Sequence, residues 1–202
     1  MAYSKFTIDE LRQKFNLGYA EEALFEGVKP LEMIAKWKVL LDEGKELALP
    51  YGSEQARKTN IVYPILMDLR ERNNKEVMIY AGLTLNADSE RGLNGECDFI
   101  LSMTRFTKVV EPPILAVVEA ERHDLELGQG QCAAQLLGAT IFNEKHNKKI
   151  NVIYGCVTTG SIWQFMKLEN NVLTLDTATY YLQDLEILIG IFQEIIEGQT
   201  LL

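Results

Sequence analysis

Three stretches of this 202-residue chain are the most informative about its fold: GECDFI at residues 95–100, PILAVVEAE at residues 113–121 and GQCAAQ at residues 130–135. An aspartate lies inside the first apolar run, and the second run ends in two glutamates two positions apart. Burying carboxylates beside an apolar core costs free energy unless a positive group neutralises them. Because proteins keep such groupings mostly where a metal ion or a reaction requires them, the pattern predicts a metal-dependent enzyme.

The surrounding segments predict an α/β protein with a mixed central sheet flanked by helices. An apolar stripe at helical spacing predicts a helix over residues 53–72, which Pro64 should kink or split. Residues 1–50 form a predicted helical extension, with a capping box at Thr7 and Glu10 and a second helix over 31–47. The remaining expected elements are strands 77–85, 96–103 and 114–121, helix 130–145, strands 150–158 and 161–168, and helix 182–196.

Composition is that of one globular domain, with residues 51–202 as its core and terminal helix. The first ten residues show no secretory signal, and the longest apolar run, 114–118, is too short to span a bilayer. The three cysteines lack metal-ligand spacing, which suits a reducing compartment. We therefore expect a cytoplasmic protein without a membrane partner.

Three acids are expected to converge at one edge of the predicted sheet. Glu119 and Glu121 share a face of their strand, with Cα atoms roughly 6.5–7 Å apart. Asp98 lies on the preceding strand, and consecutive strands are usually neighbours. Carboxylates held about 4 Å apart repel by roughly 4 kcal/mol at an effective dielectric near 20. A hard divalent cation such as Mg²⁺ or Mn²⁺ would relieve this repulsion.

Over residues 53–165 the chain resembles the PD-(D/E)xK phosphodiesterases, the restriction-endonuclease-like nucleases, in the order of its elements (αβββαβ) and in a short set of motif residues. Those residues are Glu54, Gly95-x-x-Asp98, Glu119-Ala120-Glu121, Gln131 and Gln135. The resemblance implies that Asp98 and Glu119 hold the metal, with the Ala120 carbonyl as a further ligand. It also implies that Glu54 serves a second ion or its water and that Gln131 binds near the scissile phosphate. We expect Gln131, more than Gln135, to serve the site.

The chain departs from that pattern where the motif ends in lysine, because Glu121 stands there. Glutamate cannot stabilise negative charge, although it can ligate metal or accept a proton from water. Arg57 or Lys58, three and four positions after Glu54 on the same helical face, can supply a replacement cation. Arg122 is a poorer candidate, since alternation along the strand directs it away from Glu119.

Three interpretations of the function remain open from the sequence. The first is a Mg²⁺-dependent nuclease acting on nucleic acid, with DNA the expected substrate; the second is a catalytically inactive nuclease-like module that binds nucleic acid or a protein partner. The net charge of −9 excludes wholesale adhesion to nucleic acid, but residues 51–150 are nearly balanced. A third interpretation is a structural subunit whose amino-terminal helices form a homodimer.

Structural explanations also exist for the candidate site residues. The three strand carboxylates can sit at strand ends in solvent. Glu54 can be a favourable acid in the first turn of a helix. Both glutamines can be ordinary residues of a surface helix.

Overall fold

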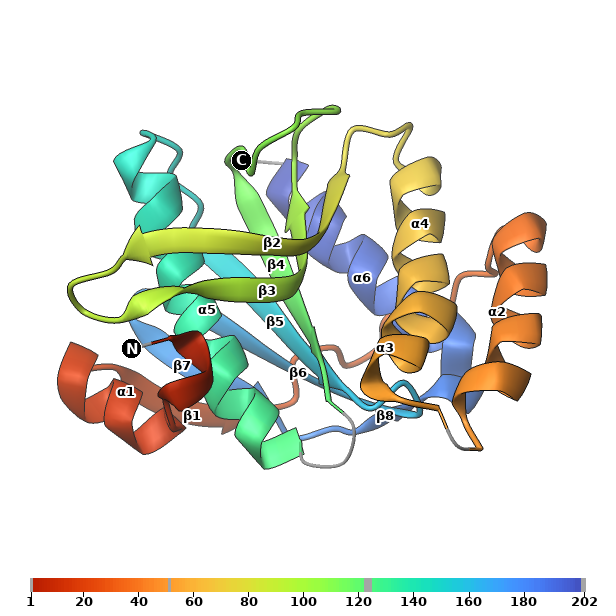
Figure 1. Ribbon diagram of the computed structural model, residues 1–202, viewed down its shortest axis with the longest axis horizontal. Coiled ribbons are helices and arrows are strands. Elements are labelled where there is room, and N and C mark those ends of the chain that lie inside the picture. The colour runs from red at the N-terminus through yellow and green to blue at the C-terminus, as the bar shows by residue number, and fades with distance from the viewer. Residues whose placement is uncertain (1, 51, 122–124, 201–202) are drawn as a thin grey trace.

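A mixed eight-stranded sheet forms the centre of the molecule in the computed structural model, which describes residues 2–50, 52–121 and 125–200 (Figure 1). The strand order is β1-β7-β6-β5-β4-β3-β2, and the short β8 pairs with β6. The β1–β7 and β4–β5 pairs are parallel, and the other pairs are antiparallel. The strands are β1 (Gly18–Glu22), β2 (Met78–Asp88), β3 (Leu93–Ser102), β4 (Ile114–Ala120), β5 (Val152–Thr158), β6 (Ile162–Glu169), β7 (Val172–Asp176) and β8 (Tyr180–Tyr181).

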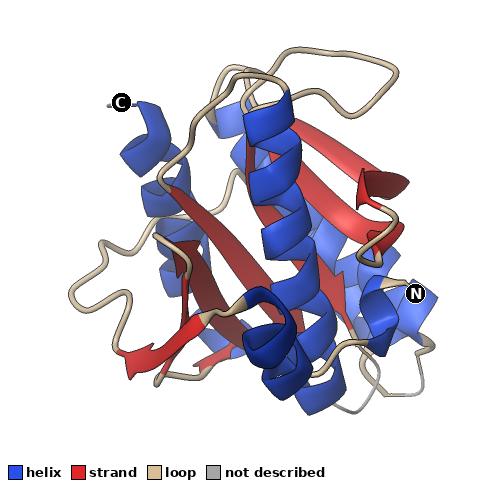
Figure 2. Ribbon diagram, turned by 90° about the vertical axis from the view of Figure 1, so that its left-hand side faces the viewer, coloured by secondary structure: helices blue, strands red, loops and turns tan. Residues whose placement is uncertain are grey.

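Helices cover both faces of this sheet. Figure 1 shows α4 and α6 on one side, with α2 outside α4, and α5 with α1 on the other. In Figure 2 the long helix α5 crosses in front of the strands. The helices are α1 (Ile8–Phe15), α2 (Ala35–Ala48), α3 (Glu54–Arg57), α4 (Tyr63–Arg72), α5 (Leu125–Lys145) and α6 (Leu185–Thr200). The α/β class, the mixed sheet and the flanking helices agree with the sequence-based prediction.

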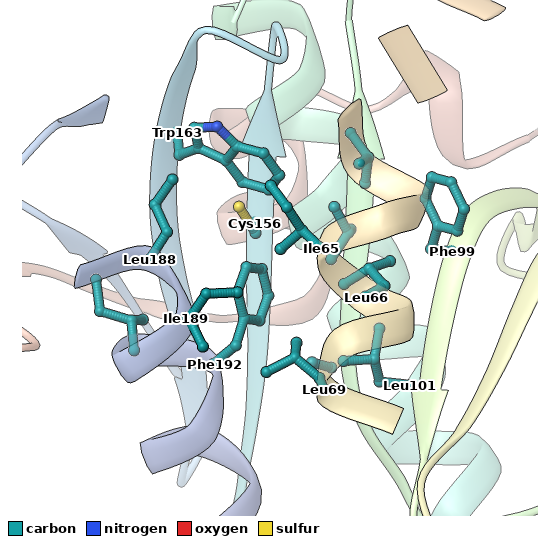
Figure 3. Close-up of a cluster of buried hydrophobic side chains, with 14 of the residues drawn as sticks. Ile65, Leu66, Leu69, Phe99, Leu101, Cys156, Trp163, Leu188, Ile189 and Phe192 are labelled. Carbon is teal, nitrogen blue, oxygen red and sulfur yellow. The ribbon is translucent and has the colours of Figure 1, made fainter. Parts of the chain in front are cut away.

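Each face of the sheet has its own apolar cluster, because β4 is buried along its whole length and sends side chains to both sides. On one face α4 and α6 pack against β3, β5 and β6, as Figure 3 shows. Trp163 and Phe192 meet there edge to face, with ring centroids 6.0 Å apart. On the other face the small side chains of α5, such as Cys132 and Ala133, pack against the sheet.

The predicted helix 53–72 is interrupted ahead of Pro64. Ser53 caps α3 by accepting a hydrogen bond from Ala56 N at 3.2 Å. A π-helical turn, Lys58–Val62, then separates α3 from α4. Proline lacks the N–H that would continue an α-helical ladder, and a π-turn places one extra residue in the helix. The helical backbone nevertheless continues from Glu54 to Arg72, so the predicted kink or split at Pro64 takes the form of a π-turn within one continuous helical region.

The amino-terminal region is more than a helical extension. The predicted capping box of Thr7 and Glu10 is present at the start of α1. However, β1 lies between α1 and α2 and pairs in parallel with β7, so the region contributes a strand to the sheet. Tyr3, Phe6 and Leu11 are buried in the α5-side cluster. This region therefore completes one face of the core.

None of the helices in the described part of the chain is both long and apolar enough to cross a bilayer. All three cysteines, Cys97, Cys132 and Cys156, are buried free thiols.

Candidate functional site

Asp98 lies where β3 and β4 part. The pairing of these strands ends at Phe99 and Val118, and Asp98 and Glu119 are the next residues on the two strands. Asp98 Oδ2 accepts a hydrogen bond from the main-chain N–H of Ala120 at 2.9 Å. The side chain thus bridges the opening between the strands, and the expected neighbours Asp98, Glu119 and Ala120 are brought together.

Lys58 ties the helical part of the site to the strands. Its Nζ lies 2.5 Å from Asp98 Oδ1 and 2.6 Å from Glu54 Oε1. The Lys58 and Asp98 side chains are only 17% and 10% exposed, whereas Glu54 is 45% exposed. Lys58 opens the π-turn, so this turn sets the side from which the ammonium group approaches β3. Of the two basic residues that the sequence suggested as a replacement cation, Lys58 is therefore the one that lies beside the strand carboxylates.

Arg57, the other candidate, has a different role. Its Nη1 donates to the main-chain carbonyl of Thr159 at 2.6 Å, which ties α3 to the turn between β5 and β6. Arg122, the poorer candidate, lies outside the described residues.

Glu119 is buried at 3% exposure and is held by two glutamines of α5. Gln135 Nε2 donates to Glu119 Oε2 at 2.9 Å, and Gln131 Nε2 donates to Oε1. Gln131 and Gln135 are four positions apart on α5 and therefore share a helical face. Gln135, which the sequence ranked below Gln131, is thus equally part of this site.

Burial and like charge shift the protonation of both strand carboxyls. Burial is the largest cause that raises the pKa of Glu119, to about 8, and the nearby charge of Asp98 adds to it. Burial also raises the pKa of Asp98, although the Lys58 ammonium and the Ala120 N–H oppose this effect. Burial lowers the pKa of Lys58, but the hydrogen bonds to Asp98 and Glu54 outweigh it and raise that pKa. A further cation near the two carboxyls would relieve their mutual repulsion.

Glu121 follows β4 and packs toward α5. Its N–H donates to the Thr158 carbonyl at 2.8 Å, which closes the last pair of the parallel β4–β5 ladder, Ala120 with Thr158. A Cβ placed on Gly128 would come 2.7 Å from Glu121 Cγ and 2.6 Å from Val157 Cγ1. Gly128 is thus the small residue that lets α5 close over this glutamate, a role that the sequence did not reveal.

The carboxylate oxygens at the strand opening are ligands that suit a small hard cation. Among the described residues, no three His, Cys, Asp or Glu side chains form a metal-binding group. Mg²⁺, however, commonly binds through one or two carboxylates and keeps several waters. Within the described chain, the buried Gln135 Oε1 beside Glu119 has no hydrogen-bond partner, and it could accept a hydrogen bond from a water on such an ion. Asp98 and Glu119 therefore offer two carboxylates that could hold Mg²⁺ together with several waters.

Comparison with protein-family models, with curated proteins and with solved structures finds no match.

Proposed function

We propose that the protein is a Mg²⁺- or Mn²⁺-dependent phosphodiesterase that hydrolyses nucleic acid, with DNA as its substrate. The observation that carries the proposal is the Lys58 ammonium held at 2.5 Å from Asp98, beside the buried Glu119. The sequence motif lacks its lysine at Glu121, and a lysine of the preceding helix stands at the strand carboxylates instead. This arrangement supports the resemblance to PD-(D/E)xK nucleases, because the needed chemical group is present on another element.

The chain's own groups have separable tasks in this proposal. Asp98, Glu119 and the Ala120 carbonyl would hold the cation, which neutralises phosphate charge and makes water more acidic. Lys58 would stabilise negative charge on the phosphate, and Glu54 would orient Lys58. Gln131 and Gln135 would keep the Glu119 carboxyl in place through their amide groups. Glu121 would accept a proton or contribute a further oxygen ligand.

A catalytically inactive module that binds nucleic acid or a protein partner is the second candidate. It is favoured by one observation: every carboxylate oxygen of Asp98 and Glu119 already has a partner within the chain. These partners are Lys58, the Ala120 N–H, Gln131 and Gln135. A permanently satisfied pair of carboxylates can serve as a structural tie.

Metal-dependent cleavage distinguishes the two candidates. We expect the wild type to cut single- or double-stranded DNA in Mg²⁺ or Mn²⁺. Glu119→Gln and Lys58→Met should each lower kcat by about 10²–10³-fold, the usual effect of removing one charge-stabilising group. Lys38→Met is the matched control, because Lys38 makes a surface ion pair with Asp42 on α2.

Equal cleavage by wild type and Lys58→Met would remove Lys58 from the mechanism. DNA binding without metal-dependent cleavage, in a wild type shown to be folded, would instead favour the inactive module.

A further inference from the structure

A cavity of about 310 Å³ opens directly beside the Lys58–Asp98 pair. Its walls include Gln55, Lys58, Tyr63, Gly82, Glu96 and Asp98. They come from α3, the π-turn, α4 and the β2–β3 hairpin. The volume is at the small end of the roughly 300–1,000 Å³ found for small-molecule sites, so the cavity suits a single compact group.

One wall of the cavity is an aromatic side chain, and another is a glycine of β2 that has no side chain. Tyr63, at the start of α4, lines it and is 40% exposed although it is a large aromatic side chain. Gly82 lies on β2 between the residues paired with Phe99 and Cys97, and therefore across from Asp98. An ideal Cβ on Gly82 would have Glu96 Oε1 as its one neighbour within 4 Å among the described residues, at 3.6 Å. Tyr63 and this open stretch of β2 thus line the same cavity.

Charge fixes how a nucleotide would lie. Glu96 and Asp98 are two residues apart on β3, and both line the cavity. A phosphate is repelled by these carboxylates except beside Lys58 and a bound cation. The uncharged base, in contrast, can stack on Tyr63, since every base has a face that stacks on aromatic rings.

We propose that this cavity binds the base and sugar of one unpaired nucleotide adjoining the scissile phosphate. This inference rests on the proposed phosphodiesterase function, and it names the substrate class as single-stranded or frayed nucleic acid. A base inside a duplex is stacked and paired, so it would have to leave the helix to enter a cavity of this size. Ribo- and deoxyribonucleotides share the recognised chemistry, and the test below separates them.

Binding of mononucleotides tests the cavity without requiring cleavage. The probes are 2′-deoxyadenosine 5′-monophosphate and adenosine 5′-monophosphate with Mg²⁺, and 2′-deoxyadenosine without metal, followed by NMR titration of the wild type. We expect Tyr63→Ala to weaken binding on the order of 10- to 100-fold, the range for losing one stacked base. Ala81→Leu, which fills the cavity from an exposed strand position, should weaken binding similarly.

Two controls keep the result interpretable. Tyr63→Phe retains the ring and should bind as the wild type does. Tyr19→Ala removes a tyrosine of similar exposure, 37%, on β1 at the opposite end of the sheet and should also leave binding unchanged. Stronger binding of the deoxy probe assigns DNA, and stronger binding of the ribo probe assigns RNA.

Cleavage assays complete the test. A single-stranded oligonucleotide should be cut faster than its duplex, and Tyr63→Ala should raise KM more than it lowers kcat. No nucleotide binding by the wild type, or equal binding by Tyr63→Ala and Tyr63→Phe, would overturn the proposed cavity. Nucleotide binding that depends on Tyr63 without cleavage of any strand would overturn the hydrolytic function while leaving the cavity assignment in place.

Discussion

At the scale of single residues, the structure decides which of two neighbouring basic residues contacts the site carboxylates. Arg57 and Lys58 adjoin on one helix, and spacing alone does not choose between them. The structure directs Lys58 to Asp98 and Arg57 to the Thr159 carbonyl. Which residue reaches Asp98 depends on where the π-turn begins and on the position of the turn between β5 and β6, which holds Arg57. A local sequence pattern contains neither piece of information.

The protonation of Glu119 gives a prediction about stability and pH. Its pKa in the folded state is about 8, above the ordinary 4.5, so between these values the folded state binds a proton that the unfolded state has released. The contribution of Glu119 to stability should therefore be complete below pH 4.5 and should be lost as pH rises toward and through 8, with a slope of at most about 1.4 kcal/mol per pH unit. Urea unfolding at pH 5, 6, 7 and 8 measures this slope.

Glu119→Gln should flatten the decline, because an amide does not titrate. Glu43→Gln, on an exposed position of α2, is the control and should keep the wild-type slope. Parallel curves for wild type and Glu119→Gln would show that burial of this carboxyl does not control the pH dependence.

At the scale of elements, the sequence predicted the helices and strands from β2 to α6 whose apolar pattern is strong. It missed β1, β7 and β8, which are five residues long or shorter. β1 carries a mostly exposed, polar pattern, and its pairing with β7 joins residues more than 150 positions apart. Such a strand is specified by its partner rather than by its own periodicity.

The approach of α5 to β4 predicts an unusual response to a helix-favouring substitution. Alanine normally stabilises a helix relative to glycine by about 1 kcal/mol. At Gly128, however, the added methyl would meet Val157 and Glu121 at 2.6–2.7 Å, and overpacking costs typically 1–3 kcal/mol. We expect Gly128→Ala to lower the free energy of unfolding and to reduce activity by displacing Glu121.

Gly198 provides the matched comparison on α6, where an added Cβ meets nothing within 4 Å among the described residues. Gly198→Ala should be neutral or stabilising in the same urea titration. A stabilising effect at both positions would mean that α5 can shift away from β4 without cost.

At the scale of the whole molecule, the amino-terminal region is part of the core. Residues before β2 supply a strand and several buried side chains to the α5 face. The apolar spacing of residues 31–47 was sufficient to predict α2, which spans Ala35–Ala48. It was not sufficient to predict that Tyr3 would reach across to the carbonyl of Leu85, 82 residues away.

Removing residues 1–22 should therefore abolish cooperative folding. Full burial of an apolar side chain contributes about 1.5–3 kcal/mol, and a domain has only about 5–15 kcal/mol in total. Several such side chains would be lost with the segment. Leu11→Ala, a milder change at a fully buried position, should cost about 2–5 kcal/mol.

Leu47→Ala tests an apolar residue of similar size that is 71% exposed on α2, and it should change stability by less than about 0.5 kcal/mol. Thermal and urea unfolding report all three variants. A truncated chain that unfolds at the wild-type temperature would show that the amino-terminal segment only covers an independent core.

The extra residue in the turn Lys58–Val62 means that the two ends of the helical region are not in register with one another. Deleting one residue there would rotate Glu54 by about 100° around the axis while α4 stayed seated against the sheet. In such a chain, one residue shorter, the side chains ahead of the deletion would no longer face the same residues of β3. A one-residue change in the length of this turn would thus alter the site, even though every carboxylate of the site stayed the same.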